Sequence, residues 1–312
     1  MTGFRTAVTR AAATRSSAGY LSLPDLVGAT LWILTVVNNG AVGLATDRAQ
    51  SVGVYGAMFG VNSTQALSVS GSGAVFSAGI GVQAINIGLG TTTVNYTGAI
   101  NTTGGNGLQA SSTTGALTIT NTGAITAAGI GILAVSGSGN QVFNVNGTVT
   151  STGNDAIRAT AGTGTIQLNV TAAVNGSNDA LELTSNGTKT VTVSAAGSLI
   201  GAIDAVNSIG TGALILDNSG IVSGIVRQQG VAPVTVTNRA GATLTTTFLL
   251  DAGADTISNA GTLNIAGSNV FGAGADSFTN AVGGILNVTS NTTLGGLETF
   301  IQNGRINLNT FT

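Results

Sequence analysis

The feature that most constrains the fold of this chain is an internal repeat, with a period of roughly 22–25 residues, that begins near residue 52. Val94-Asn-Tyr-Thr-Gly-Ala-Ile100 is followed one period later by Ile119-Thr-Asn-Thr-Gly-Ala-Ile125. The same frame returns in Phe143-Asn-Val-Asn-Gly-Thr-Val149, Leu168-Asn-Val-Thr-Ala-Ala-Val174 and Val191-Thr-Val-Ser-Ala-Ala-Gly-Ser-Leu199. A period in this range is typical of a solenoid, in which each repeat packs only on its neighbours.

Each repeat contains two or three short runs in which apolar and polar residues alternate, separated by Gly, Asn or Ser. Such alternation predicts strands with one buried face. The chain has only two prolines, Pro24 and Pro233, so nearly every backbone N–H can join a strand ladder. We therefore predict an all-β fold, a right-handed parallel β-helix (solenoid) of about 11 coils that occupies residues 49–312.

Equivalent residues of successive coils should stack about 4.8 Å apart. Ile125, Val149 and Val174 recur once per period, so we expect one inward-facing column, with Thr148 facing outward. Stacked Asn side chains are expected to hydrogen-bond to one another. Only 6% of the residues are charged, which fits this geometry because a charge repeated in every coil would repel its copies.

The composition excludes several kinds of function. The chain has no His and no Cys, so it cannot carry a Ser-His-Asp triad, a cysteine nucleophile, a zinc site, a haem ligand or a disulfide. Nine basic and eleven acidic residues give a net charge of −2, which lacks the basic surface typical of nucleic-acid binding. We expect a protein that is not an enzyme, with no cofactor and no nucleic-acid partner.

Residues 1–48 differ in composition from the repeats. The stretch 1–19 carries three Arg and no acid, and an apolar run of about 12 residues follows at 26–37. A helix needs about 20 apolar residues to span a bilayer, whereas a basic start, a short apolar run and then small residues are typical of a secretory signal. Residues 1–48 are therefore interpreted either as an export signal or as a segment that caps the first coil.

Several repeats resemble a known class of protein. Thr120-Asn-Thr-Gly-Ala-Ile125, Asp217-Asn-Ser-Gly-Ile-Val222 and Ser258-Asn-Ala-Gly-Thr-Leu263 resemble the recurrent (T/S)-N-x-G-x-I element of bacterial autotransporter passenger domains. Gly296-Leu-Glu-Thr-Phe-Ile-Gln-Asn-Gly-Arg-Ile306 resembles a variant common shortly before their translocation unit. The resemblance covers roughly residues 90–310.

This resemblance implies an exported protein on the surface of a Gram-negative bacterium, acting as a β-helical stalk in adhesion or surface structure. Its implied partners are cell-surface or matrix ligands, or further copies of itself. It also implies an outer-membrane barrel. We expect that barrel in cis downstream of Thr312 or in trans, because no run of ten-residue alternating membrane strands is present in the sequence.

Three acidic residues fall in register with the repeat. Asp155, Asp179 and Asp204 recur once per period, and Arg158 and Glu182 lie close to them in the sequence. Such a column of carboxylates has three possible roles: it caps turns, it holds Ca²⁺, or it supplies the general acid of a polysaccharide lyase or hydrolase.

The sequence favours the turn role, since no His, no aromatic platform for a sugar and no cluster of basic residues accompanies these acids. We therefore assign no catalytic or cofactor residue, and keep Asp155, Asp179 and Asp204 as candidates for a metal. The two alternative functions are a carbohydrate-active β-helix enzyme and a cation-dependent surface-layer or matrix component. Ala252-Gly-Ala-Asp255 and Ala273-Gly-Ala-Asp276 resemble calcium-binding nonapeptide repeats, but they lack the tandem nine-residue spacing.

Overall fold

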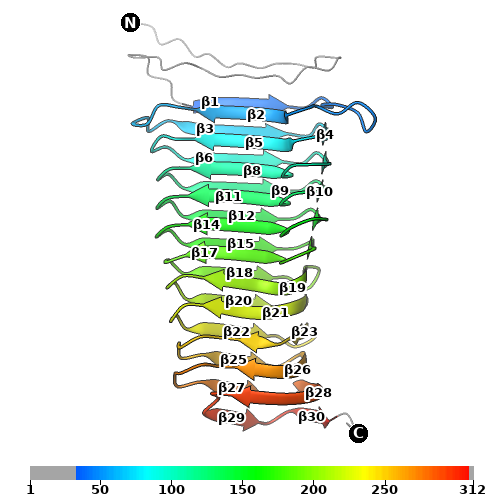
Figure 1. Cartoon of the computed structure of the whole chain (residues 1–312), viewed down its shortest axis with the longest axis vertical. Coiled ribbons are helices and arrows are strands. Elements are labelled where there is room, and N and C mark those ends of the chain that lie inside the picture. The colour runs from blue at the N-terminus through cyan, green and yellow to red at the C-terminus, as the bar shows by residue number, and fades with distance from the viewer. Residues whose placement is uncertain (1–32, 309–312) are drawn as a thin grey trace, which may run out of the picture.

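The computed structural model describes residues 33–308, which form one stack of β-strand coils (Figure 1). The prediction of an all-β, parallel β-helix of the right-handed type with about 11 coils is confirmed. No helix is present between residues 33 and 308, and so none there is long and apolar enough to cross a membrane. Most of the predicted export signal or cap lies in residues 1–32, outside the described residues.

One side of the stack is a sheet of 12 parallel strands, which successive turns of the chain join in order (Figure 1). Its strands in spatial order are β1 (Ile33–Asn38), β3 (Ala66–Gly71), β6 (Thr92–Tyr96), β9 (Leu117–Asn121), β12 (Gln141–Val145), β15 (Ile166–Val170), β18 (Lys189–Val193), β20 (Leu214–Asn218), β22 (Val234–Asn238), β25 (Thr256–Asn259), β27 (Ser277–Asn280) and β29 (Thr299–Gln302). The stack thus includes the strand Ile33–Asn38, which lies within the N-terminal segment 1–48 and pairs with β3.

The other strands form an 18-stranded sheet that begins as two rows. The row of longer strands contains β2 (Val52–Met58), β5 (Ile80–Asn86), β8 (Leu108–Ser112), β11 (Ile132–Ser136), β14 (Ile157–Ala161) and β17 (Leu181–Ser185). The row of shorter strands contains β4 (Val75–Ser77), β7 (Ile100–Thr102), β10 (Ile125–Ala127), β13 (Val149–Ser151) and β16 (Ala173–Gly176). Each of these coils therefore has three strands around a narrow interior.

The two rows join in β19, whose coil keeps a 25-residue step, and the coils become shorter from the next strand of this sheet onward. β19 (Ser198–Ile209) pairs with both β16 and β17 as one continuous strand, and β21 (Ile221–Gln229) follows it through a bulge. The remaining strands of this sheet are β23 (Thr243–Thr246), β24 (Phe248–Leu249), β26 (Thr262–Val270), β28 (Ile285–Gly295) and β30 (Arg305–Leu308). Stacked residues are 25 apart at Asn144 and Asn169 but 20 apart at Asn218 and Asn238, which is below the predicted minimum of about 22.

The core is a set of aliphatic columns that run along the stack. Ile125 pairs with Val149 and Val149 pairs with Val174, and all three side chains are fully buried, whereas Thr148 is exposed. The predicted inward column is therefore confirmed. A second column runs through the 12-stranded sheet and consists of Val69, Val94, Ile119, Phe143, Leu168, Val191, Leu216, Val236, Ile257 and Phe278.

Buried asparagines form a hydrogen-bonded ladder at the ends of strands in the C-terminal coils. The Nδ2 atoms of Asn218, Asn238 and Asn259 each donate to the Oδ1 atom of the asparagine one coil further on, at 2.8 Å. Asn280 ends the ladder by donating to Oε1 of Gln302 at 3.1 Å. The predicted stacking of Asn side chains is confirmed, and it satisfies polar atoms that would otherwise be buried without a partner.

Candidate functional site

The predicted acidic ladder exists as one column. The backbone N–H of Ala156 donates to the carbonyl of Asp179, and that of Ala180 donates to the carbonyl of Asp204, so the three aspartates occupy the same place in consecutive coils. All three are buried, with at most 3% of the residue exposed. They lie just before strands β14 and β17 and within β19, where the chain enters the row of longer strands.

Hydrogen bonds explain why aspartate recurs there. The N–H of Asp179 donates to Oδ1 of Asp155, and the N–H of Asp204 donates to Oδ1 of Asp179, both at 3.2 Å. Asn178 and Asn207 add side-chain donors to Asp155 and Asp179. Each of these two carboxylates thus joins its coil to the next one, a structural role that differs from the capping of its own turn that the sequence favours.

Two arginines lie beside this ladder, although the sequence shows no cluster of basic residues near it. Nη2 of Arg158 is 2.6 Å from Oδ2 of Asp155, and its Nε is 3.0 Å from Oε1 of Glu182. Nε of Arg227 is 2.9 Å from Oδ2 of Asp204. Arg227 was missed because it is distant from Asp204 in the sequence, in a shortened coil, and pairs with it only across the strands β19 and β21.

The surroundings of Asp179 and Glu182 disfavour the charged form of both side chains. Burial raises the pKa of Asp179, and the nearby carboxylates of Asp204 and Asp155 raise it further. Burial also raises the pKa of Glu182, against the lowering effect of Arg158. Oxygen atoms of Asp155, Asp179 and Glu182 lie within 4.8 Å of one another, close enough to share a cation, but Arg158 already contacts two of these residues. Its guanidinium supplies the positive charge that a metal would supply.

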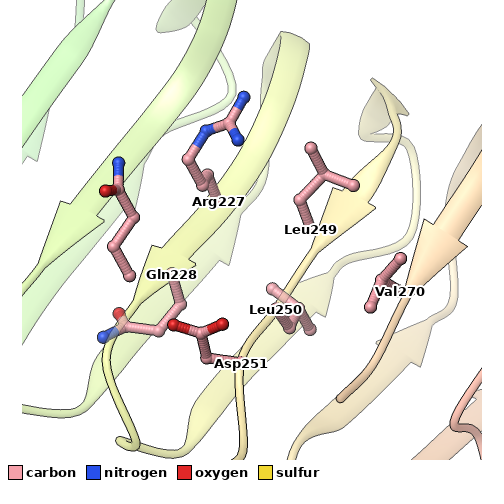
Figure 2. A pocket seen from close by; sticks show the side chains of 7 residues that line it. Arg227, Gln228, Leu249, Leu250, Asp251 and Val270 are labelled. Atoms are coloured by element: carbon pink, nitrogen blue, oxygen red, sulfur yellow. The ribbon is translucent and has the colours of Figure 1, made fainter.

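An open hollow lies next to the end of this ladder, on the 18-stranded sheet (Figure 2). Figure 2 shows Arg227 at one end of it, Asp251 at the other and the aliphatic side chains Leu249, Leu250 and Val270 along one side. Asp251 accepts a hydrogen bond from the N–H of Gly230 at 2.6 Å. The hollow offers a few polar groups and no aromatic ring for stacking a sugar.

Sequence reasoning missed a fully buried lysine, Lys189. Its Nζ donates to the carbonyl oxygens of Ser185, Ile209 and Gly212 at 3.0, 3.2 and 2.7 Å. Burial lowers the pKa of Lys189 to about 8. The alternating pattern could have revealed it, because Lys189 is in phase with the buried Val191 and Val193.

Lys189 should make stability depend on pH in the alkaline range. Because the pKa of Lys189 is about 8 in the folded chain and 10.5 ordinarily, the unfolded chain binds more protons between these values. Its contribution is fully present above pH 10.5 and is lost as the pH falls through about 8. We expect urea denaturation of the wild type to show a free energy of unfolding that rises across this window, relative to Lys189→Gln.

Glutamine is the matched replacement, since Gln141 occupies the same column two coils earlier. There its Nε2 donates to Oγ of Ser136 at 2.9 Å and to the carbonyl of Thr160 at 2.7 Å. Lys189→Gln should therefore fold at neutral pH with at least wild-type stability. Identical pH profiles for the two proteins would contradict the assignment of a perturbed Lys189.

The chain was also compared with known proteins. No protein-family model matches it, and no match was found among curated proteins or solved structures.

Proposed function

We propose that this chain is a non-enzymatic rod exported to the surface of a Gram-negative bacterium, where it acts in adhesion or in surface structure. The observation that carries the proposal is the outer face of the 12-stranded sheet. Its first outward column is Ser68, Thr93, Thr118, Val142, Gln167, Thr190, Ile215, Thr235, Thr256, Ser277 and Thr299. Its second is Ser70, Asn95, Thr120, Asn144, Asn169, Thr192, Asp217, Thr237, Ser258, Thr279 and Ile301.

This surface, hereafter the hydroxyl–amide face, is regular and almost uncharged. Asp217 is the one ionisable side chain in these two columns, and Arg239 neutralises it in a salt bridge. A face of this kind suits neutral, hydroxyl-rich partners such as surface glycans, through many weak contacts repeated from coil to coil. The resemblance of residues 90–310 to autotransporter passenger domains supports export and a place on the cell surface.

The experiment places charge on this face. Thr118→Arg combined with Thr235→Arg should reduce binding to host cells or immobilised matrix glycans at least tenfold, because each arginine must be desolvated in a neutral interface. The matched control, Thr126→Arg combined with Thr245→Arg, puts the same charge on the row of shorter strands and its continuation, and should bind normally.

Two outcomes would overturn the proposal. One is equal binding by the test and control pairs. The other concerns location: in the source bacterium, an antibody to the chain should label intact cells, and labelling only after lysis would rule out a surface role.

A carbohydrate-active enzyme is the second candidate, favoured by the buried Asp179 with its raised pKa close to two other carboxyl groups. A carboxyl group whose pKa is raised by burial is suited to act as a general acid on a glycosidic bond. This alternative requires that the wild type release reducing ends or unsaturated products from polysaccharides and that Asp179→Asn does not.

A further inference from the structure

A second column of carboxylates lies in the last coils, at the start of the strands of the 12-stranded sheet. The register of β22, β25, β27 and β29 aligns Val234, Asp255, Asp276 and Glu298. Asp255 and Asp276 are 0% and 1% exposed. They are the aspartates of the two Ala-Gly-Ala-Asp segments, and each is in phase with the buried apolar residue two positions later.

One oxygen of each carboxylate accepts a hydrogen bond from a backbone N–H of the preceding coil. The N–H of Val234 donates to Oδ1 of Asp255 at 2.8 Å, the N–H of Asp255 to Oδ1 of Asp276 at 2.7 Å, and the N–H of Asp276 to Oε2 of Glu298 at 2.7 Å. In the preceding coils a backbone carbonyl accepts this bond, as Pro233 does from Leu214. The carboxylates thus replace a backbone acceptor.

This replacement leaves four oxygen atoms with unused capacity. Oδ2 of Asp255 and Oδ2 of Asp276 are buried and have no hydrogen-bond partner. Within residues 33–308, the carbonyls of Ala254 and Ala275 accept no backbone hydrogen bond. The N–H groups that would bond to them, those of Val234 and Asp255, donate instead to the carboxylates of Asp255 and Asp276. Two carboxylate oxygens and two carbonyl oxygens therefore lie at one corner of adjacent coils.

Within residues 33–308, no positively charged side chain forms a salt bridge with either carboxylate, whereas Asp155 and Asp204 each have an arginine. Burial raises the pKa of Asp255 to about 7, with Asp276 and Asp251 adding to the effect. An unpaired carboxylate buried in a protein is strongly disfavoured, so a pair of them in contact with nothing positive indicates a missing partner.

We propose that Asp255 and Asp276 bind a Ca²⁺ ion between their Oδ2 atoms. Adjacent strands are about 4.8 Å apart and Ca²⁺ bonds to oxygen at about 2.3–2.6 Å, so an ion midway between two stacked carboxylates reaches both. Ca²⁺ accepts carboxylate, carbonyl and water oxygens in irregular arrangements. Ala254 and Ala275, which precede the two aspartates, are exposed, so the turn that carries their carbonyls borders solvent. The inference is independent of the proposed adhesive function.

The test is calorimetric titration of the chelator-treated full chain with CaCl₂, together with its melting temperature. We expect one site, a melting temperature that rises with Ca²⁺, and hydrogen-exchange protection gained mainly in residues 250–305. Asp276→Asn should weaken Ca²⁺ binding at least tenfold. Without Ca²⁺ it should be as stable as the wild type or more so, because it removes an unpaired charge.

Asp217→Asn is the matched control, since it removes one acid of the same type at the outer face and should keep the full response to Ca²⁺. Asp255→Asn repeats the test if Asp276→Asn fails to fold. The proposal is overturned if the wild type does not bind Ca²⁺ at millimolar concentration, or if Asp276→Asn and Asp255→Asn keep the response, which would place the ion at Asp155, Asp179 and Glu182. Stabilisation by acid alone, with no effect of Ca²⁺, would instead indicate a shared proton and also overturn it.

Discussion

Replacing Val149 by aspartate should destabilise the middle of the rod by about 3–5 kcal/mol, the range for an uncompensated buried charge. Val149 is fully buried between Ile125 and Val174. Its Cγ1 lies against the backbone of Gly131, where even a Cβ atom added to that glycine would come within 2.5 Å of it. The carboxylate would therefore have neither a partner nor room to turn toward water.

Hydrogen exchange followed by mass spectrometry checks both the size and the reach of this effect. In a stack of coils each repeat contacts only its neighbours, so protection should fall between residues 125 and 174 and persist in the C-terminal coils. Thr148→Asp is the matched control, because its side chain is exposed one residue earlier, and it should change stability by no more than about 0.5 kcal/mol. Equal tolerance of aspartate at 148 and 149 would contradict the register of the whole column.

The sequence was sufficient for the fold because the repeat and the strand pattern point to the same structure. Alternation gives the buried face of each strand, and the regular step from Ile125 to Val149 to Val174 then gives the neighbour in the next coil. What the repeat did not predict is the joining of two rows into the continuous strands β19 and β21. The corner between them is replaced by a register shift near Asp204, where Gly224 of β21 takes a positive φ.

The site could be predicted only in part, for the same reason. Asp155 and Asp179 kept the regular step, so their alignment was visible, but Arg227 reaches Asp204 through a shortened coil. Lys189 and Asp255 had to be found from their phase with the buried residues of β18 and β25, because a residue at such a position is buried whatever its charge. Whether a buried charged side chain is neutralised depends on contacts between coils, and the sequence alone did not reveal those contacts.

Interrupting the buried asparagine ladder should have the second largest effect. Asn259 accepts a hydrogen bond from Asn238 at 2.8 Å and donates to Oδ1 of Asn280 at 2.8 Å and to the carbonyl of Ile285 at 3.1 Å. Asn259→Leu keeps the branching and the number of side-chain heavy atoms, but leucine is bulkier and removes all three bonds. Each buried polar atom left without a partner costs about 1–3 kcal/mol, and we expect a total loss of about 3 kcal/mol, because Asn238 keeps a second bond to Thr262.

Asn169→Leu is the matched control for this ladder. Its Nδ2 donates to Oδ1 of Asn144 at 3.0 Å, the same geometry one coil apart, but on the outer face of the same sheet, where water can replace the lost partner. We expect it to change stability by no more than about 0.5 kcal/mol. Hydrogen exchange of the two variants should show lost protection around residues 238–285 in Asn259→Leu alone. Equal stability of both variants and the wild type would contradict this prediction. It would mean that the cost of burying the amides equals the gain from their hydrogen bonds, so that the ladder sets only the alignment of the coils.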